Sequence, residues 1–187
     1  MRESWSLPKS INIGGINYKI RSDFRAVIDI LIALSDPELK DVEKMEVMYR
    51  ILYYDWEKIP YKYKTEAIEK ASKFIDAGSE DEEKNHARIM DWEQDAPILI
   101  PAINDTLGYE IRSRKYVHWW TFLGAYMSMK DSVATTVISI RKKQSKHQKL
   151  EKWEKKFVRE NKSICNLRKK LTKEEQEEKE RINKWLG

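Results

Sequence analysis

Three carboxylates in one short stretch are the first residues of the sequence that could do chemistry. Asp91, Glu93 and Asp95 lie almost next to one another, and grouped carboxylates can serve general acid–base catalysis or bind a metal ion. The stretch predicts a helix, in which residues two apart point to different sides, so the three do not converge on one metal. Asp91 and Asp95 share a face and could bind a ligand together. Solvated carboxylates, or ion pairs with Arg88 and nearby lysines, are the commoner arrangement.

The other residues with catalytic or metal-binding potential are scattered. His86, His118 and His147 show no metal-site spacing. The sequence holds no phosphate-binding glycine loop and no nucleophile elbow. Cys165 is the single cysteine, which excludes an internal disulfide and fits a reducing cytoplasm. We therefore expect no enzyme activity, no cofactor and no bound metal.

Two apolar segments must form the framework. From Ile89 to Leu107, apolar residues recur at intervals of three and four, which predicts a central helix. Pro97 and Pro101 predict a kink or a break in it, and Gly108 is a natural stop. The segment from Tyr116 to Met127 is dense in aromatic residues and is the predicted partner of that helix.

The remaining patterns indicate a mainly α fold. Apolar residues alternate on both sides of Gly14-Gly15, which predicts a β-hairpin over residues 10–21. A capped helix is expected over 24–34, and the chain is poor in glycine, with 6. No apolar run is long enough to span a membrane. We predict a multi-helix bundle with an N-terminal hairpin and an extended basic C-terminal helical segment. Its helical core domain comprises residues 1–144, and a basic, charged helical appendage comprises residues 145–187.

The charge of the chain is unevenly distributed. Residues 141–187 carry 17 Lys and Arg against 8 Asp and Glu, a net charge of +9, whereas residues 1–140 carry 19 against 23, a net charge of −4. A basic segment can bind nucleic-acid phosphates, here through Lys142, Lys143, Lys146 and Lys149. The acids mixed into the segment, and the lack of stacking aromatics spaced among the cations, disfavour nucleic acid as the partner.

A second interpretation of the basic segment is an amphipathic helix offered to a protein. Apolar residues from Leu150 to Leu171 fall on heptad positions, and one helix of that length would span ~33 Å. A solvated helix folded back on the body is the third interpretation. The candidate partner-binding residues are Leu150, Trp153, Phe157, Ile164, Arg141, Lys142, Lys143 and Lys146. Trp153 and Trp185 lie in charged segments and are the better interface candidates among the tryptophans.

Several sequence blocks, in order along residues 11–165, resemble those of a phage protein family. They are Tyr18-Lys19-Ile20-Arg21-Ser22-Asp23-Phe24-Arg25, Asp91-Trp92-Glu93-Gln94-Asp95-Ala96-Pro97, His118-Trp119-Trp120-Thr121-Phe122-Leu123-Gly124, Ile138-Ser139-Ile140-Arg141-Lys142-Lys143 and Lys149-Leu150-Glu151-Lys152-Trp153-Glu154. With these blocks the chain resembles the bacteriophage gene-product-fifteen family of siphophages and prophages of Gram-positive bacteria. The second and third blocks are the specific ones.

The resemblance implies a tail-assembly chaperone. Such a protein would bind the tape-measure protein in the host bacterial cytoplasm, help the tail tube polymerise and be absent from the mature virion. The tail-tube protein, another tail-assembly chaperone and a second copy of the chain are further expected partners. Two alternatives stay open: a nucleic-acid-binding protein that uses the basic segment, and a virion tail or neck subunit.

Overall fold

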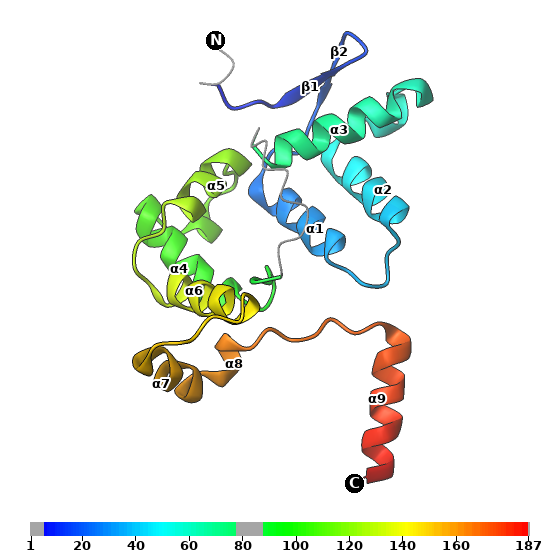
Figure 1. The fold of residues 1–187 in the computed structure, drawn as a ribbon. Helices are drawn as coiled ribbons and strands as arrows, with labels where there is room; N and C mark the ends of the chain where they lie inside the picture. The colour runs from blue at the N-terminus through cyan, green and yellow to red at the C-terminus, as the bar shows by residue number, and fades with distance from the viewer. Residues whose placement is uncertain (1–5, 78–87, 187) are drawn as a thin grey trace.

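The structure, a computed structural model, describes residues 6–77 and 88–186 and is mainly helical with one two-stranded hairpin (Figure 1). The strands are β1 (Ser10–Ile13) and β2 (Ile16–Lys19), and the helices are α1 (Phe24–Leu34), α2 (Asp41–Leu52), α3 (Lys64–Ile75), α4 (Ala96–Leu107), α5 (Trp119–Met127), α6 (Val133–Ser145), α7 (Lys152–Glu160), α8 (Lys162–Cys165) and α9 (Lys173–Leu186). Short 3₁₀ turns at Trp56–Lys58, Tyr61–Tyr63 and Ile111–Ser113 connect them. The predicted fold class is confirmed. Within the described ranges, none of the helices combines the length and apolarity that crossing a bilayer needs.

The hairpin forms where the sequence predicts it and packs on the helices. Gly14 and Gly15 have φ of 54° and 85°, which a glycine pair adopts at little cost in a two-residue turn. A Cβ on Gly14 would lie 2.5 Å from the ring of Tyr63, so the turn sits directly against the start of α3. Lys70 of α3 also donates to the carbonyl oxygen of Asn12 at 2.7 Å. The helices thus supply the packing that an isolated hairpin lacks.

The starts of α1 and α5 are bonded to each other. The carboxylate of Asp23 caps α1 by accepting from the backbone N–H of Arg25 at 3.0 Å, and it also accepts from the N–H of Val117 at 2.9 Å. The backbone N–H of Trp119 donates to Ser22 at 2.7 Å. One carboxylate therefore satisfies orphan donors at two chain segments far apart in the sequence.

The tryptophans of α5 anchor that helix to the end of α3. The indole N–H groups of Trp119 and Trp120 donate to the carbonyl oxygens of Ile75 and Phe74, at 2.7 and 2.9 Å. These carbonyls belong to the last turn of α3, where the carbonyl of Phe74 also accepts from the backbone N–H of Ala77 at 3.2 Å. Trp119 is 2% exposed and stacks on Phe122. The aromatic density of 116–127 is therefore mostly core.

The predicted helix from Ile89 to Leu107 is wrong in its first half. Residues 92–95 form a turn, and α4 begins only at Ala96. The turn forms because the carboxylate of Asp91 accepts from the backbone N–H groups of Glu93 and Gln94, at 2.9 and 2.7 Å, which competes with helical bonding. Pro97 lies in the first turn of α4, where no donor is lost, and only Pro101 is inside the helix.

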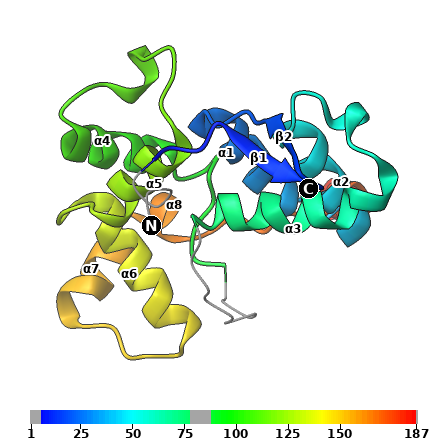
Figure 2. The ribbon, with the colours of Figure 1, turned by 90° about the horizontal axis from the view of Figure 1, so that it is seen from above.

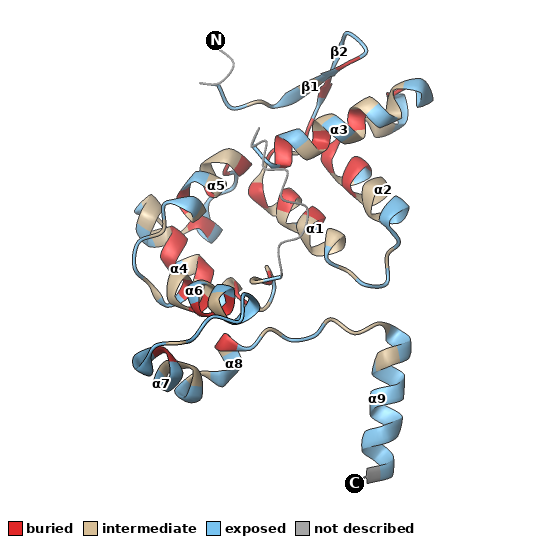
Figure 3. Cartoon of the chain, in the orientation of Figure 1, coloured by how far each residue is buried: buried red, intermediate tan, exposed pale blue. Residues whose placement is uncertain are grey.

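The chain beyond α6 runs along one side of the molecule. Figures 1 and 2 show α7 and α8 beside α6, then an extended strap, residues 166–172, that crosses to the far side and leads into α9. Figure 3 shows α9 exposed almost throughout, whereas α1, α3 and α4 carry buried residues. The predicted continuous helix from Leu150 to Leu171 is therefore wrong. It breaks at Asn161, whose φ of −126° is not helical and whose side chain donates to the carbonyl oxygen of Phe157 at 3.0 Å.

Candidate interaction surface

Arg141, one of the predicted partner-binding residues, is instead a buried structural cation. It is 4% exposed, and its guanidinium forms a bidentate ion pair with Asp95 at 2.6 and 2.9 Å. It also donates to the carbonyl oxygens of Ile89, Ile164 and Cys165, at 3.2, 2.6 and 3.0 Å. A guanidinium offers five donors in a rigid fork, and here they join three segments of chain. Arg141 is thus not available to a partner.

The carboxylates of the 91–95 turn are equally committed to the fold. Asp95 accepts from the backbone N–H of Asp91 at 2.8 Å in addition to its pair with Arg141. Asp91 pairs with Arg88 and, at 3.6 Å, with Lys170. Burial alone would raise the pKa of Asp91, but the Gln94 N–H and the two cations together lower it. The turn is therefore a junction that the strap binds to. Its third carboxylate, Glu93, is 60% exposed, pairs with Lys170 at 3.3 Å, and lines an open hollow of about 320 Å³ together with Asp91.

Helix α7 is attached to α6 through a buried glutamate. Glu154 is 1% exposed and accepts from Lys143 at 2.7 Å and from the backbone N–H of Glu151 at 2.7 Å. The hydrogen bond from Lys143, with that from Glu151, lowers the pKa of the Glu154 carboxyl. Glu154 follows Leu150 by four residues, on the inward side of the predicted stripe. This spacing in the sequence could have indicated that Glu154 is buried. It was overlooked because the prediction followed only the apolar residues.

The predicted apolar anchors divide between the two sides of the segment. Leu150, Phe157 and Ile164 are partly buried, whereas Trp153 is 59% exposed. Lys142 and Lys146 are exposed, and Lys143 is one-third exposed beside Glu154. Contacts from Arg141 and Lys143 thus hold α7 and α8 to the core. The division into domains at residue 144 stays a prediction.

The outward side of α7 combines a tryptophan with cations. An open hollow of about 640 Å³ there is lined by Glu151, Lys152, Trp153, Lys155, Lys156 and Arg159. We call these residues the basic α7 surface; all six are exposed. An aromatic ring surrounded by long cationic side chains can bury apolar area and attract acidic groups at the same time. This arrangement suits an acidic partner with apolar side chains of its own.

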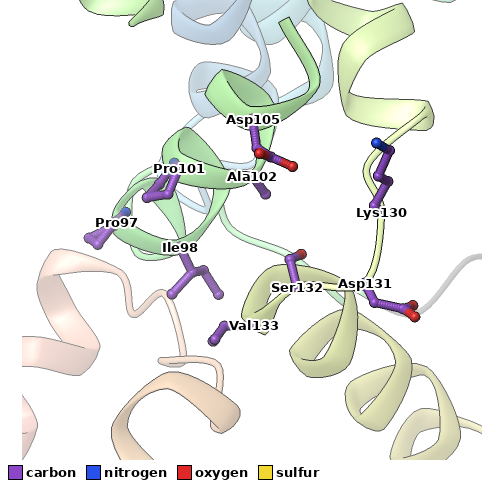
Figure 4. Close-up of a pocket in the computed structure, with 9 residues that line it drawn as sticks. All are labelled: Pro97, Ile98, Pro101, Ala102, Asp105, Lys130, Asp131, Ser132 and Val133. Atoms are coloured by element: carbon purple, nitrogen blue, oxygen red, sulfur yellow. The ribbon is translucent and has the colours of Figure 1, made fainter. Parts of the chain in front are cut away.

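A second concave surface lies between α4 and α6. A groove of about 380 Å³ is lined by Pro97, Ile98, Pro101, Ala102, Asp105, Lys130, Asp131, Ser132 and Val133. Figure 4 shows that these side chains come from α4 on one side and from the α5–α6 connection and the start of α6 on the other. No sequence pattern pointed to it, because only the fold brings residues 97–105 and 130–133 together.

His118 and Cys165 are buried and have structural roles, whereas His147 is exposed. The Nδ1 atom of His118 accepts from the backbone N–H of Trp120 at 3.0 Å, so its Nε2–H donates to the carbonyl oxygen of Pro8 at 2.9 Å. Burial lowers the pKa of His118 and raises that of the buried Cys165 thiol. Among residues 6–77 and 88–186, no group of three or more His, Cys, Asp or Glu side chains could hold a metal ion. His86 lies outside the described residues.

Comparison with known proteins gives one result. The family model described as Bacteriophage Gp15 protein matches residues 4–167. No curated protein and no solved structure matches the chain. The matched range covers α1 to α8, including the basic α7 surface, and ends before α9.

Proposed function

The chain belongs to the bacteriophage Gp15 protein family, and we propose that it acts there as a non-enzymatic tail-assembly chaperone for the tape-measure protein. Family membership indicates a phage structural or morphogenesis protein. The chaperone role, the tape-measure partner, action in the host cytoplasm and absence from the finished virion are the finer parts of the proposal.

The observation that carries the proposal is the basic α7 surface. Its Trp153 is 59% exposed on a helix that the buried Glu154 and Lys143 fix to the body. A rigidly mounted, exposed tryptophan costs little conformational entropy when a partner covers it, and tryptophan is a preferred anchor of protein interfaces. The surrounding cations give the contact an electrostatic, reversible component.

This chemistry suits a long helical client. A tape-measure protein is expected to present repeated amphipathic helices that would aggregate before the tail tube closes around them. Each contact with such a client must be weak enough to be displaced as the tube grows. One tryptophan with a cationic rim on each chaperone copy supplies contacts of that kind, and many copies along one client raise the overall avidity.

The test is co-expression of the full-length chain with the tape-measure protein of the same genome, followed by pull-down and size exclusion. We compare the wild type with Trp153→Ala and with the double variant Lys156→Glu/Arg159→Glu. The matched control is Lys62→Glu/Lys115→Glu, which makes the same charge change at exposed positions away from α7. Wild type and control should keep the tape measure soluble, and both α7 variants should lose most of that effect. If the wild type and all three variants keep the tape measure equally soluble, the client does not bind the basic α7 surface. The α4–α6 groove is then the next candidate for the client contact.

The same surface also favours a second candidate function, the binding of nucleic acid. Cations around an exposed ring are a known arrangement for single-stranded DNA and RNA. A salt titration with DNA separates the two functions, because contacts to several phosphates give a steep loss of affinity with salt. Background binding with a flat salt response would remove the nucleic-acid function. Mass spectrometry of purified particles tests the remaining alternative, a virion tail or neck subunit, which would be found in the particle.

A further inference from the structure

Helix α9 has an apolar end without a partner in its own chain among the described residues. Ile182 and Trp185 are 49% and 86% exposed. A lone helix of this length is marginal in water, and most helices owe their stability to packing of an apolar face. Trp185 therefore marks a face that is open to a partner surface.

The strap directs α9 away from the body. The side chain of Gln94 accepts from the N–H of Arg168 at 2.9 Å and donates to the carbonyl oxygen of Asn166 at 2.8 Å. Lys170 binds Ser35 at 3.0 Å, and the backbone N–H of Lys173 binds Glu38 beyond α1. These contacts hold the start of α9 beside the α1–α2 connection, and Figures 1 and 2 both place α9 on the opposite side of the molecule from α7.

The first half of α9 and the outward side of α7 carry opposite charge. Residues 173–180 contain five glutamates and two lysines, whereas residues 152–160 contain four cations and two glutamates; Arg181 and Lys184 follow in the second half of α9. The exposed acids of α9 are Glu174, Glu177, Glu178 and Glu180, within its first two and a half turns, and its tryptophan comes near its end. The basic α7 surface has the reverse order, with Trp153 at its start and Lys156 and Arg159 after it. Laid antiparallel, the two helices place tryptophan beside tryptophan and acids beside cations.

We propose that α9 of one copy docks antiparallel on the basic α7 surface of a second copy, so that chains associate head to tail. The lengths agree. At about 1.5 Å per residue, Trp153 precedes Arg159 by roughly 9 Å, and Glu178 precedes Trp185 by roughly 10 Å. The contact joins two different surfaces, so it repeats from copy to copy and builds an open chain or a ring.

Helix geometry selects the residues that make the contact. Glu174, Glu178, Ile182 and Trp185 are spaced by four, four and three residues and so share one face of α9, together with Arg181. Glu177 and Glu180 lie away from the centre of this face, with Glu177 at its edge, three residues after Glu174. On α7, Lys156 and Arg159 share the outward face with Trp153, and Glu154 points inward. The on-face and off-face acids of α9 therefore provide a test pair and a control pair of equal charge.

This association goes beyond the chaperone role and does not depend on it, because no tape-measure protein takes part. It does use the same α7 surface. In assembled chains α9 would cover the client-binding Trp153 until a client displaces it, so self-association and client binding would compete.

The experiment measures the mass of the full-length chain by light scattering over a concentration series at low and high salt, without any client. The wild type should exceed the 22.4 kDa of one copy at least twofold at low salt and fall toward it at high salt, where charges are screened. We call Glu174→Lys/Glu178→Lys, in α9, the arm variant and Lys156→Glu/Arg159→Glu, in α7, the surface variant. Each should keep the mass of a single copy at every salt concentration. The control Glu177→Lys/Glu180→Lys should associate like the wild type.

Mixing the arm and surface variants is the decisive step. Each then offers the charge that the other lacks, so the mixture should regain a mass of at least two copies. A wild type that stays at 22.4 kDa at low salt overturns the proposal. The proposal also fails if either variant keeps the wild-type mass or if the mixture of the two variants stays monomeric. Self-pairing of α9 would leave the surface variant associated, which counts against the α7 contact. Circular dichroism confirms that the variants keep their helices.

Discussion

The body and the C-terminal segment use the same residue types for opposite purposes. In the body, Trp119 is 2% exposed and its indole N–H is bonded to the end of α3. In the C-terminal segment, Trp153 and Trp185 are 59% and 86% exposed. Likewise, Arg141 lies buried in an ion pair, whereas Arg159, eighteen residues later, lines an open surface. The residue type therefore does not show whether a tryptophan or an arginine belongs to the core or to a binding surface here. The groups that each side chain contacts in the structure show it.

A large effect on stability is expected at the ion pair that joins the two regions. Asp95→Ala should lower the free energy of unfolding by about 3–5 kcal/mol, because it leaves the buried Arg141 guanidinium without its counter-charge. Urea denaturation followed by tryptophan fluorescence measures this change. Arg112→Ala is the control, since its pair with Glu110 is largely exposed and its loss should change the free energy of unfolding little. Similar losses for both variants would mean that the Arg141 pair does not hold the segment to the body.

A structural feature of this protein could be predicted from the sequence where the residues that determine it are close together in the chain. The hairpin and α1 were predicted correctly, because a glycine pair and a capping aspartate act on adjacent residues. The role of Arg141 was missed because its partners lie 46, 24 and 23 positions away. A cation in a basic segment gives no sign of an acid that far along the chain.

The errors in helix boundaries have a related cause. Apolar spacing suggested continuous helices across 89–107 and 150–171, but single polar side chains ended them. Asp91 bonds the backbone ahead of it, and Asn161 bonds the turn behind it. Periodicity grouped Trp153 with Leu150 and Phe157, but those two are partly buried and Trp153 is 59% exposed. Trp153 was singled out as an interface candidate from its charged neighbours, which is a local signal.

An intermediate effect is expected at the Glu154–Lys143 pair that attaches α7. Glu154→Gln should cost about 1–2 kcal/mol near neutral pH, with Lys143 partly screened by solvent. The pKa of Glu154 is lowered from its ordinary 4.5, so the stabilisation is complete above that value and is lost as the pH falls through the lower, folded-state pKa. The difference between wild type and variant should therefore shrink in acid.

Thermal unfolding at several pH values measures that difference. The control is Glu160→Gln on the same helix, whose exposed pair with Lys156 spans 4.0 Å and should show little effect at any pH. If the Glu154→Gln difference stays constant down to strongly acidic pH, the ionised carboxylate is not what attaches α7.

The smallest effect on stability is expected where the largest effect on binding is proposed. Trp153→Ala should change the free energy of unfolding by no more than about 0.5 kcal/mol, because the exposed ring loses few contacts. Trp119→Ala should cost about 3–5 kcal/mol, since it empties part of the core and removes the bond to Ile75. Chemical denaturation of both variants beside the wild type measures the contrast. A large loss for Trp153→Ala would show that its ring supports the fold, and the loss of client binding in that variant would then say nothing about an interface. A small loss together with failed client rescue would separate folding from binding at this one side chain.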